Sequence, residues 1–210
     1  MKDSYLNLAD TLSQSACASG STTPAGLAGH DVHFYRTEES LVNSVVDFLA
    51  AGIRVGQPVI VIATPEHRRA FISGLRSRNL DPEELFAGRL AIWLDARETL
   101  NSFMDDGMPN RELFIATVGS VFERLLDKRH YLVVRAFGEM VDLLWKDGNV
   151  DGAILLERHW NELAMKYKYS LLCGYSIDNF VAEAGVAGFR RVCDHHTSAR
   201  LLDPPQQNVA

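Results

Sequence analysis

Two charged residues, Arg135 and Glu139, flank the short stretch Ala136-Phe137-Gly138 and are placed where they could hold a polar ligand group. The preceding residues, Tyr131 to Val134, are aromatic or branched and apolar, which predicts a buried strand of a parallel sheet. Glu139 to Trp145 then begin a helical pattern. Ligands of open α/β sheets bind outside the carboxyl ends of the strands. Arg135 and Glu139 are therefore candidate ligand contacts, although structural ion pairs also occupy such junctions.

Other polar side chains follow predicted strands in the same way and are expected to line one crevice with nearby aromatic residues. Such a crevice, mostly apolar with a few polar anchors, suits a small organic ligand. Each residue also has a plain structural interpretation: His33 as a core histidine, Thr64 as a helix cap, Trp145 as part of the core. The predicted ligand-binding set is His33, Tyr35, Arg36, Thr64, His67, Arg135, Phe137, Glu139 and Trp145.

Strands and helices that would position these residues alternate along the chain. This alternation predicts an α/β fold: three layers, with a mainly parallel sheet and helices on both faces. Strands are expected at 30–35, 59–63, 90–94, 131–137 and 169–175. Helices are expected from Thr37 to Gly52 and at 65–78, 82–87, 96–104, 111–128, 139–146, 150–167 and 180–201, the last broken by Gly185 and Gly188.

Composition excludes several classes of function. The net charge of −6 and the absence of a Lys/Arg-rich run argue against direct nucleic-acid binding. No apolar stretch approaches the roughly 18–20 residues of a membrane span, and the Ser/Thr-rich start is no secretory signal. The three cysteines have no metal-like spacing, so a cytoplasmic location is the simplest expectation.

Known catalytic and cofactor motifs are not found. The first strand-helix junction, residues 35–40, has no Gly and no Lys, and two carboxylates stand at the helix start, which disfavours a phosphate-binding loop. No GxGxxG fingerprint is present. His30 and His33 would face opposite sides of a strand, and His195 and His196 would diverge on a helix, so no metal site is expected. Cys173 lies among leucines and is interpreted as a buried apolar residue. We therefore expect no enzyme and no cofactor.

Several motifs, in order, resemble the MEDS domain (methanogen/methylotroph, DcmR sensory domain). They are His30-Asp31-Val32-His33-Phe34-Tyr35, Phe48-Leu49-Ala50-Ala51-Gly52-Ile53, Gly56-Gln57-Pro58-Val59, Ala63-Thr64-Pro65-Glu66-His67, Phe137-Gly138-Glu139-Met140-Val141 with Leu144-Trp145, Leu156-Glu157 with Trp160-Asn161-Glu162-Leu163, and Ser170-Leu171-Leu172-Cys173-Gly174-Tyr175. The expected organisation is a flexible leader at 1–28, a MEDS-like sensory domain at 29–180, and a C-terminal helix with a disordered tail at 181–210. The segment from Phe189 to His196 also looks like the short tail that often follows this domain.

The resemblance implies a sensory module that recognises small hydrocarbon derivatives and is often joined to histidine kinases or DNA-binding domains. It also implies kinship with the RecA/KaiC-like ATPase fold. Three departures indicate that the nucleotide machinery is lost: residues 35–40 replace the phosphate loop, Ile62-Ala63 replace the paired Glu before Thr64-Pro65, and the metal-binding Asp has no clear counterpart except Glu139.

The leading hypothesis is thus a non-catalytic, cytoplasmic sensory domain that binds a small, partly apolar organic ligand and relays to a histidine kinase or a transcriptional regulator. A homodimer is among the expected partners. The alternative is a protein-protein interaction module of a two-component or anti-sigma type pathway, in which side chains fill the ancestral pocket. The weakest hypothesis is a residual nucleotide-binding enzyme.

Overall fold

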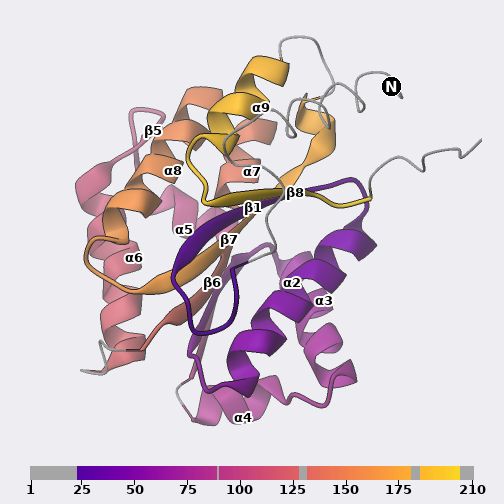
Figure 1. Ribbon diagram of the computed structural model, residues 1–210. Coiled ribbons are helices and arrows are strands. Elements are labelled where there is room, and N and C mark those ends of the chain that lie inside the picture. Colours follow the sequence, from indigo (N-terminus) through magenta and orange to yellow (C-terminus); the bar gives the residue numbers. More distant parts are fainter. Residues whose placement is uncertain (1–22, 89, 128–131, 181–184, 204–210) are drawn as a thin grey trace, which may run out of the picture.

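The computed structural model describes residues 23–88, 90–127, 132–180 and 185–203 (Figure 1). A six-stranded sheet with the order β3-β2-β6-β7-β1-β8 forms the middle layer, and every neighbouring pair of strands is parallel. The predicted three-layer α/β fold is confirmed. The six strands are β1 (Gly29–Tyr35), β2 (Val59–Ala63), β3 (Ala91–Asp95), β6 (Val134–Gly138), β7 (Tyr169–Ser176) and β8 (Ser198–Leu201).

Helices cover both faces of the sheet, and each face has its own hydrophobic core (Figure 1). One core lies under α2 (Glu38–Arg54), α3 (Pro65–Ser77) and α4 (Pro82–Ala87). The larger core lies under α5 (Ala96–Asn101), α6 (Arg111–Leu126), α7 (Met140–Lys146), α8 (Val150–Leu163), the short 3₁₀ helix η1 (Ile177–Phe180) and α9 (Gly185–Cys193). The central strands are buried on both sides, which explains why they read as continuous apolar runs.

Helix starts are set by local caps that the sequence predicts. The side chain of Thr37 accepts a hydrogen bond from the Ser40 amide at 3.2 Å, and Glu38 and Glu39 occupy the first turn of α2. Thr64 caps α3, whose first residue is Pro65. Only two residues separate β1 from α2, so this connection has no room for the glycine-rich loop of the RecA/KaiC-like ATPases.

Several predicted elements differ from the structure, among them the helix expected at 150–167, which ends at Leu163. The helix expected at 180–201 is wrong: α9 ends at Cys193, and residues 198–201 form β8, which pairs in parallel with β1 (Figure 1). The helix expected at 96–104 ends at Asn101, and a small antiparallel hairpin follows, β4 (Met104–Asp105) with β5 (Met108–Pro109). The strand expected at 131–137 lies at Val134–Gly138.

The predicted leader and the predicted tail lie only partly within the residues that the structure describes. Residues 1–22 of the predicted leader and 204–210 of the predicted tail lie outside the described residues. Thr23, also in the predicted leader, packs against the domain: its amide donates to Asp31 Oδ2 at 2.6 Å and its hydroxyl to Asp31 Oδ1 at 2.9 Å.

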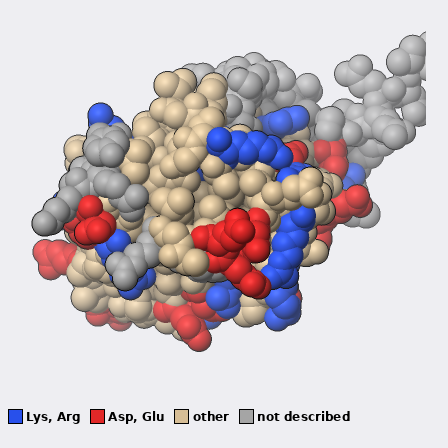
Figure 2. Space-filling model, turned by 90° about the horizontal axis from the view of Figure 1, so that it is seen from below, with Lys and Arg blue, Asp and Glu red and all other residues tan. Residues whose placement is uncertain are grey.

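Charges intermingle on the face shown in Figure 2, where Lys and Arg side chains lie among Asp and Glu. The described residues include several exposed ion pairs, such as Arg76 with Glu83 at 2.7 Å and Arg191 with Asp151 at 2.8 Å. In the described part of the chain, no helix has both the length and the apolar character needed to cross a membrane.

Candidate functional site

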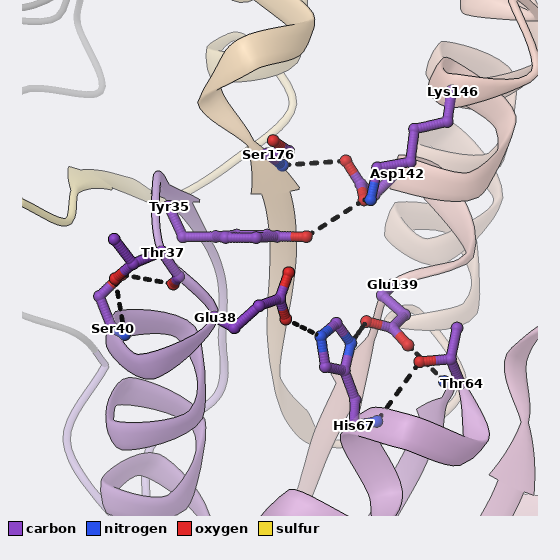
Figure 3. A network of polar contacts seen from close by, with 10 residues as sticks. All are labelled: Tyr35, Thr37, Glu38, Ser40, Thr64, His67, Glu139, Asp142, Lys146 and Ser176. Atoms are coloured by element: carbon purple, nitrogen blue, oxygen red, sulfur yellow. Dashed lines mark hydrogen bonds and ion pairs between the residues drawn. The ribbon is translucent and has the colours of Figure 1, made fainter.

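A polar network joins the carboxyl ends of three strands, as Figure 3 shows. Glu139, directly after β6, accepts a hydrogen bond from the Thr64 amide through Oε1 and contacts Nδ1 of His67 through Oε2. Nε2 of His67 contacts the carboxylate of Glu38, in the first turn of α2. Thr64, His67 and Glu139 of the predicted ligand-binding set thus lie together, and Glu38, which is not in that set, reaches across from the start of α2.

His67 is held as a cation between two carboxylates. Burial alone would lower its pKa, but the hydrogen bonds and charges of Glu139 and Glu38 outweigh burial and raise the pKa of His67 to about 9. Glu139 is 3% exposed, whereas the Glu38 side chain is 70% exposed. This edge of the sheet therefore carries protein charges that pair with one another.

Tyr35 belongs to a neighbouring cluster centred on Asp142 of α7 (Figure 3). The Tyr35 hydroxyl donates to Asp142 Oδ2 at 3.3 Å. Lys146 Nζ lies 2.7 Å from the same oxygen. The other oxygen, Oδ1, accepts from the Ser176 amide at 2.9 Å and from Asn179 Nδ2 at 2.7 Å. Burial and the Asp142 charge raise the pKa of Tyr35, so this hydroxyl stays a donor. The cluster ties the end of β1 to α7 and to the end of β7.

Arg135 lies elsewhere, because it is the second residue of β6 and not its last. The expectation that Arg135 and Glu139 share the carboxyl edge is therefore wrong. The guanidinium is buried under α2: Nε donates to the Phe48 carbonyl at 3.0 Å, and Nη1 donates to the Thr23 carbonyl at 3.0 Å and to Ser170 Oγ at 3.2 Å. Its Cζ also stands 4.0 Å from the centre of the Phe48 ring. Burial lowers the pKa of Arg135 to about 10.

The absence of a side chain at Gly52 leaves room for the aliphatic part of Arg135. A Cβ at position 52 would come within 2.9 Å of Arg135 Cγ and 3.1 Å of Cδ, so a side chain there would displace the arginine stem. This close approach explains the glycine in the predicted motif 48–53.

A cavity of about 420 Å³ opens beside Arg135, between α2, the segment 23–25 and the end of β8. Its size falls in the range of small-molecule sites, which is about 300–1,000 Å³. Among the hydrogen bonds of the described residues, none engages Nη2 of Arg135. The cavity is lined by Thr23, Pro24, Ala25, Ser44, Asp47, Phe48, Ala51, Arg135, Arg200 and Leu202.

His33 adjoins this cavity without lining it. Its Nδ1 lies 2.6 Å from Oγ of Ser44, a lining residue. Burial lowers the pKa of His33 to about 4, and the charge of Arg200, another lining residue, acts in the same direction. The imidazole is therefore neutral at ordinary pH.

The remaining predicted residues do not join one crevice. Arg36 is exposed at the β1–α2 connection. Phe137 is 1% exposed and meets Phe71 edge-on with ring centres 5.2 Å apart. Trp145 lies in the other core, on the opposite face of the sheet, against Tyr175 and Phe180. The expected single crevice thus separates into a carboxyl-edge network, a cavity beside Arg135 and two core positions.

Residues that the sequence analysis missed come mainly from α2 and β8. One side of α2 lines the cavity with residues spaced three and four apart: Ser44, Asp47, Phe48 and Ala51. The same spacing is found on any helix face that packs or is exposed, so the sequence alone does not single these residues out. Arg200 lines the cavity because residues 198–201 pair with β1, and the sequence analysis places these residues in a helix.

A known protein family matches most of this chain. The family model described as the methanogen/methylotroph, DcmR sensory domain (MEDS) matches residues 29–196. The match reaches from β1 through α9 and extends past residue 180, where the sequence analysis ends the domain. No curated protein matches the chain.

Proposed function

The chain belongs to the MEDS family of sensory domains, and on this premise we propose that it binds a small, partly apolar organic ligand in the cavity beside Arg135. The domain would act without catalysis, from the cytoplasm, and relay occupancy to a histidine kinase or a transcriptional regulator. The observation that carries the proposal is a ligand-sized cavity at a buried arginine.

The lining residues indicate the chemistry of this ligand. Phe48, Ala51 and Leu202 offer apolar surface, while Arg135 and Arg200 offer positive charge. The one lining carboxylate, Asp47, is already paired with Arg78, whose Nε donates to Asp47 Oδ1 at 2.8 Å. A short hydrocarbon derivative with a carboxylate, carbonyl or hydroxyl oxygen fits this combination, since guanidinium groups bind such acceptors strongly.

The two alternative functions receive less support from the described residues. An interaction module would be favoured by an exposed apolar face on residues 180–201, but Phe189, Val192 and Cys193 are buried against the larger core. A nucleotide enzyme would need a site for phosphates at the start of α2, where Glu38 pairs with His67.

A thermal-shift screen of the whole chain tests the proposal. The panel holds short-chain carboxylic acids, ketones, aldehydes, alcohols and halogenated hydrocarbons. A ligand at 100 times its dissociation constant stabilises the folded state by about 2.7 kcal/mol, so binding raises the melting temperature. Failure of every class to stabilise the wild-type chain would contradict the proposal.

Two leucine variants locate the binding. Ala51→Leu fills the cavity and is expected to abolish the increase in melting temperature, whereas Ala116→Leu, at an exposed position of α6, is expected to keep it.

Arg135→Lys should weaken binding of carboxylates more than binding of alcohols, because lysine lacks the planar fork of donors. A ligand that binds Ala51→Leu as well as wild type would place its site elsewhere.

A further inference from the structure

Four buried side chains outside the sites described above converge on one point. His30 comes from β1, Glu157 from α8, Cys173 from β7, and His196 from the segment between α9 and β8. One donor atom from each, an imidazole nitrogen, a carboxylate oxygen or the thiol sulfur, lies within 4.8 Å of all the others. Glu157 and Cys173 are fully buried, and His30 and His196 are 7% and 9% exposed.

The donor atoms of His30, Cys173 and Glu157 lie at separations close to the edges of a coordination tetrahedron, and His196 approaches the second oxygen of the same carboxylate. His30 Nε2 lies 3.2 Å from Glu157 Oε2 and 3.3 Å from Cys173 Sγ. Cys173 Sγ lies 3.6 Å from Glu157 Oε2, and His196 Nε2 lies 3.5 Å from Glu157 Oε1. Tetrahedral Zn²⁺, with bonds of about 2.0–2.3 Å to such donors, places neighbouring donor atoms roughly 3.3–3.7 Å apart.

The surrounding hydrogen bonds orient both imidazoles for ligation through Nε2. Asn161 Nδ2 donates to the His195 carbonyl at 3.0 Å, which turns its Oδ1 toward His30 Nδ1, 2.9 Å away. His30 Nδ1 therefore carries the proton. His196 Nδ1 lies 2.7 Å from the Val192 carbonyl, which can only accept, so this nitrogen is protonated as well. Metal-binding histidines are held by outer contacts of this kind.

Neutral rings in these tautomers leave the cluster with an excess of acceptors. Both Nε2 atoms present lone pairs to one another and to the Glu157 carboxylate, and the Cys173 thiol contributes a single proton. The Tyr175 hydroxyl donates to Glu157 Oε1 at 2.8 Å, the oxygen that His196 Nε2 approaches. A cation at the centre would contact all four groups at once and offset the mutual repulsion of their lone pairs.

We propose that His30, Glu157, Cys173 and His196 form a binding site for a divalent transition-metal cation of the Zn²⁺ class. Two imidazoles, a carboxylate and a thiolate suit Zn²⁺ in donor type and number, and the two anionic ligands balance its charge. Ligation requires that Cys173 lose its thiol proton. Because four protein donors close the coordination sphere, the site is structural and not catalytic.

The position of the site fits this role and gives the ion a route inward. The four ligands connect two neighbouring strands with a helix and with the segment that leads into β8. A second cavity, of about 280 Å³, is lined by His30 and by Asn161, whose side chain orients the His30 ring. An ion would therefore reach the cluster beside His30 and, once bound, fasten the C-terminal segment to the sheet.

Cobalt provides the direct test, because Co²⁺ replaces Zn²⁺ in tetrahedral sites and is coloured. The whole chain is stripped with a chelator and titrated with Co²⁺. The proposal expects one ion per chain, intense visible bands of four-coordinate Co²⁺, and a near-ultraviolet thiolate-to-cobalt charge-transfer band. Zn²⁺ should abolish these bands by displacement and raise the melting temperature. A wild-type chain that gives no such bands overturns the proposal.

Variants assign the ligands. Cys173→Ser should remove the charge-transfer band, while Cys193→Ser, at a buried cysteine outside the cluster, should keep it. Asn161→Ala should weaken binding about 10–100-fold, as loss of an outer contact does. His196→Gln should weaken binding more than Asn161→Ala does, and His159→Gln, at a buried histidine on α8, should leave it unchanged.

Folding of each variant is checked by circular dichroism in the absence of metal. If Cys173→Ser does not fold, Glu157→Gln keeps the thiolate and should shift the visible bands at lower affinity. A charge-transfer band that survives in Cys173→Ser, or that disappears in Cys193→Ser, places the ion elsewhere and refutes the assignment. Ala51→Leu should bind Co²⁺ normally, so this test is independent of the organic ligand.

Discussion

The imidazole of His67 lies between the carboxylate of Glu139, which follows β6, and that of Glu38, which begins α2. This contact links two strand ends to the helix that begins after β1. The pair His67–Glu38 therefore fastens the start of α2 to the start of α3.

Stability at alkaline pH is expected to depend on His67. Its pKa in the folded state is about 9, above the ordinary value of 6.5, so its stabilising effect is complete below about pH 6.5 and is lost as the pH rises through 9. Urea unfolding across this range should show a loss on the order of 2 kcal/mol in the free energy of unfolding. His67→Gln should remove that slope; an unchanged slope in the variant would assign it to other groups.

Stability at acid pH is expected to depend on His33 with the opposite sign. Burial holds its pKa at about 4 in the folded chain against 6.5 ordinarily. The unfolded chain therefore binds the proton first, and stability falls as the pH drops from 6.5 toward 4, on the order of 2 kcal/mol. His33→Gln, which can still bond Ser44, should flatten this part of the curve, and NMR titration of the His33 ring should give the low pKa directly.

Gly188 of α9 is required by Trp145. A Cβ at position 188 would lie 2.7 Å from two carbons of the Trp145 ring. Gly188→Ala should destabilise the chain by about 1–3 kcal/mol through overpacking. Trp145→Phe in the same chain should recover part of the loss, because the smaller ring vacates the contact. Chemical denaturation of the two single variants and the double variant measures the coupling; strictly additive effects would disprove the contact.

The Tyr35 hydroxyl is expected to serve stability and not ligand binding. Tyr35→Phe removes its hydrogen bond to Asp142 and should lower the free energy of unfolding by about 1 kcal/mol. Any ligand found by thermal shift should bind the variant with unchanged affinity. A loss of affinity would instead return Tyr35 to the ligand site.

The sequence predicts the strands of the sheet well where each is buried on both faces. Runs such as Val59–Ala63 have no polar residue, and only a central parallel strand explains them. It fails at β8, because Ser198–Leu201 is short and mixed in polarity, and its extended state depends on pairing with β1. The residue pattern of 198–201 does not by itself indicate that this segment pairs with β1.

The candidate sites were predictable only where neighbouring strand ends meet. Thr64, His67 and Glu139 follow adjacent strands, so topology alone brings them together. Arg135 lies away from the carboxyl edge because β6 begins at Val134 and continues to Gly138, and the carbonyls of Thr23 and Phe48 allow the guanidinium to be buried. The cluster around Glu157 combines four segments that are far apart in the sequence, so spacing rules for metal ligands could not find it.

The fixation of Arg135 against Phe48 and Gly52 has a consequence for the ligand binding proposed above. Its guanidinium is held by two carbonyls, a hydroxyl and an aromatic face before any molecule arrives. A ligand bound at this wall of the cavity would therefore cost the Arg135 side chain little conformational entropy. Discrimination among small molecules of similar polarity then rests on their shape, because the rigid wall does not adjust to a poor fit.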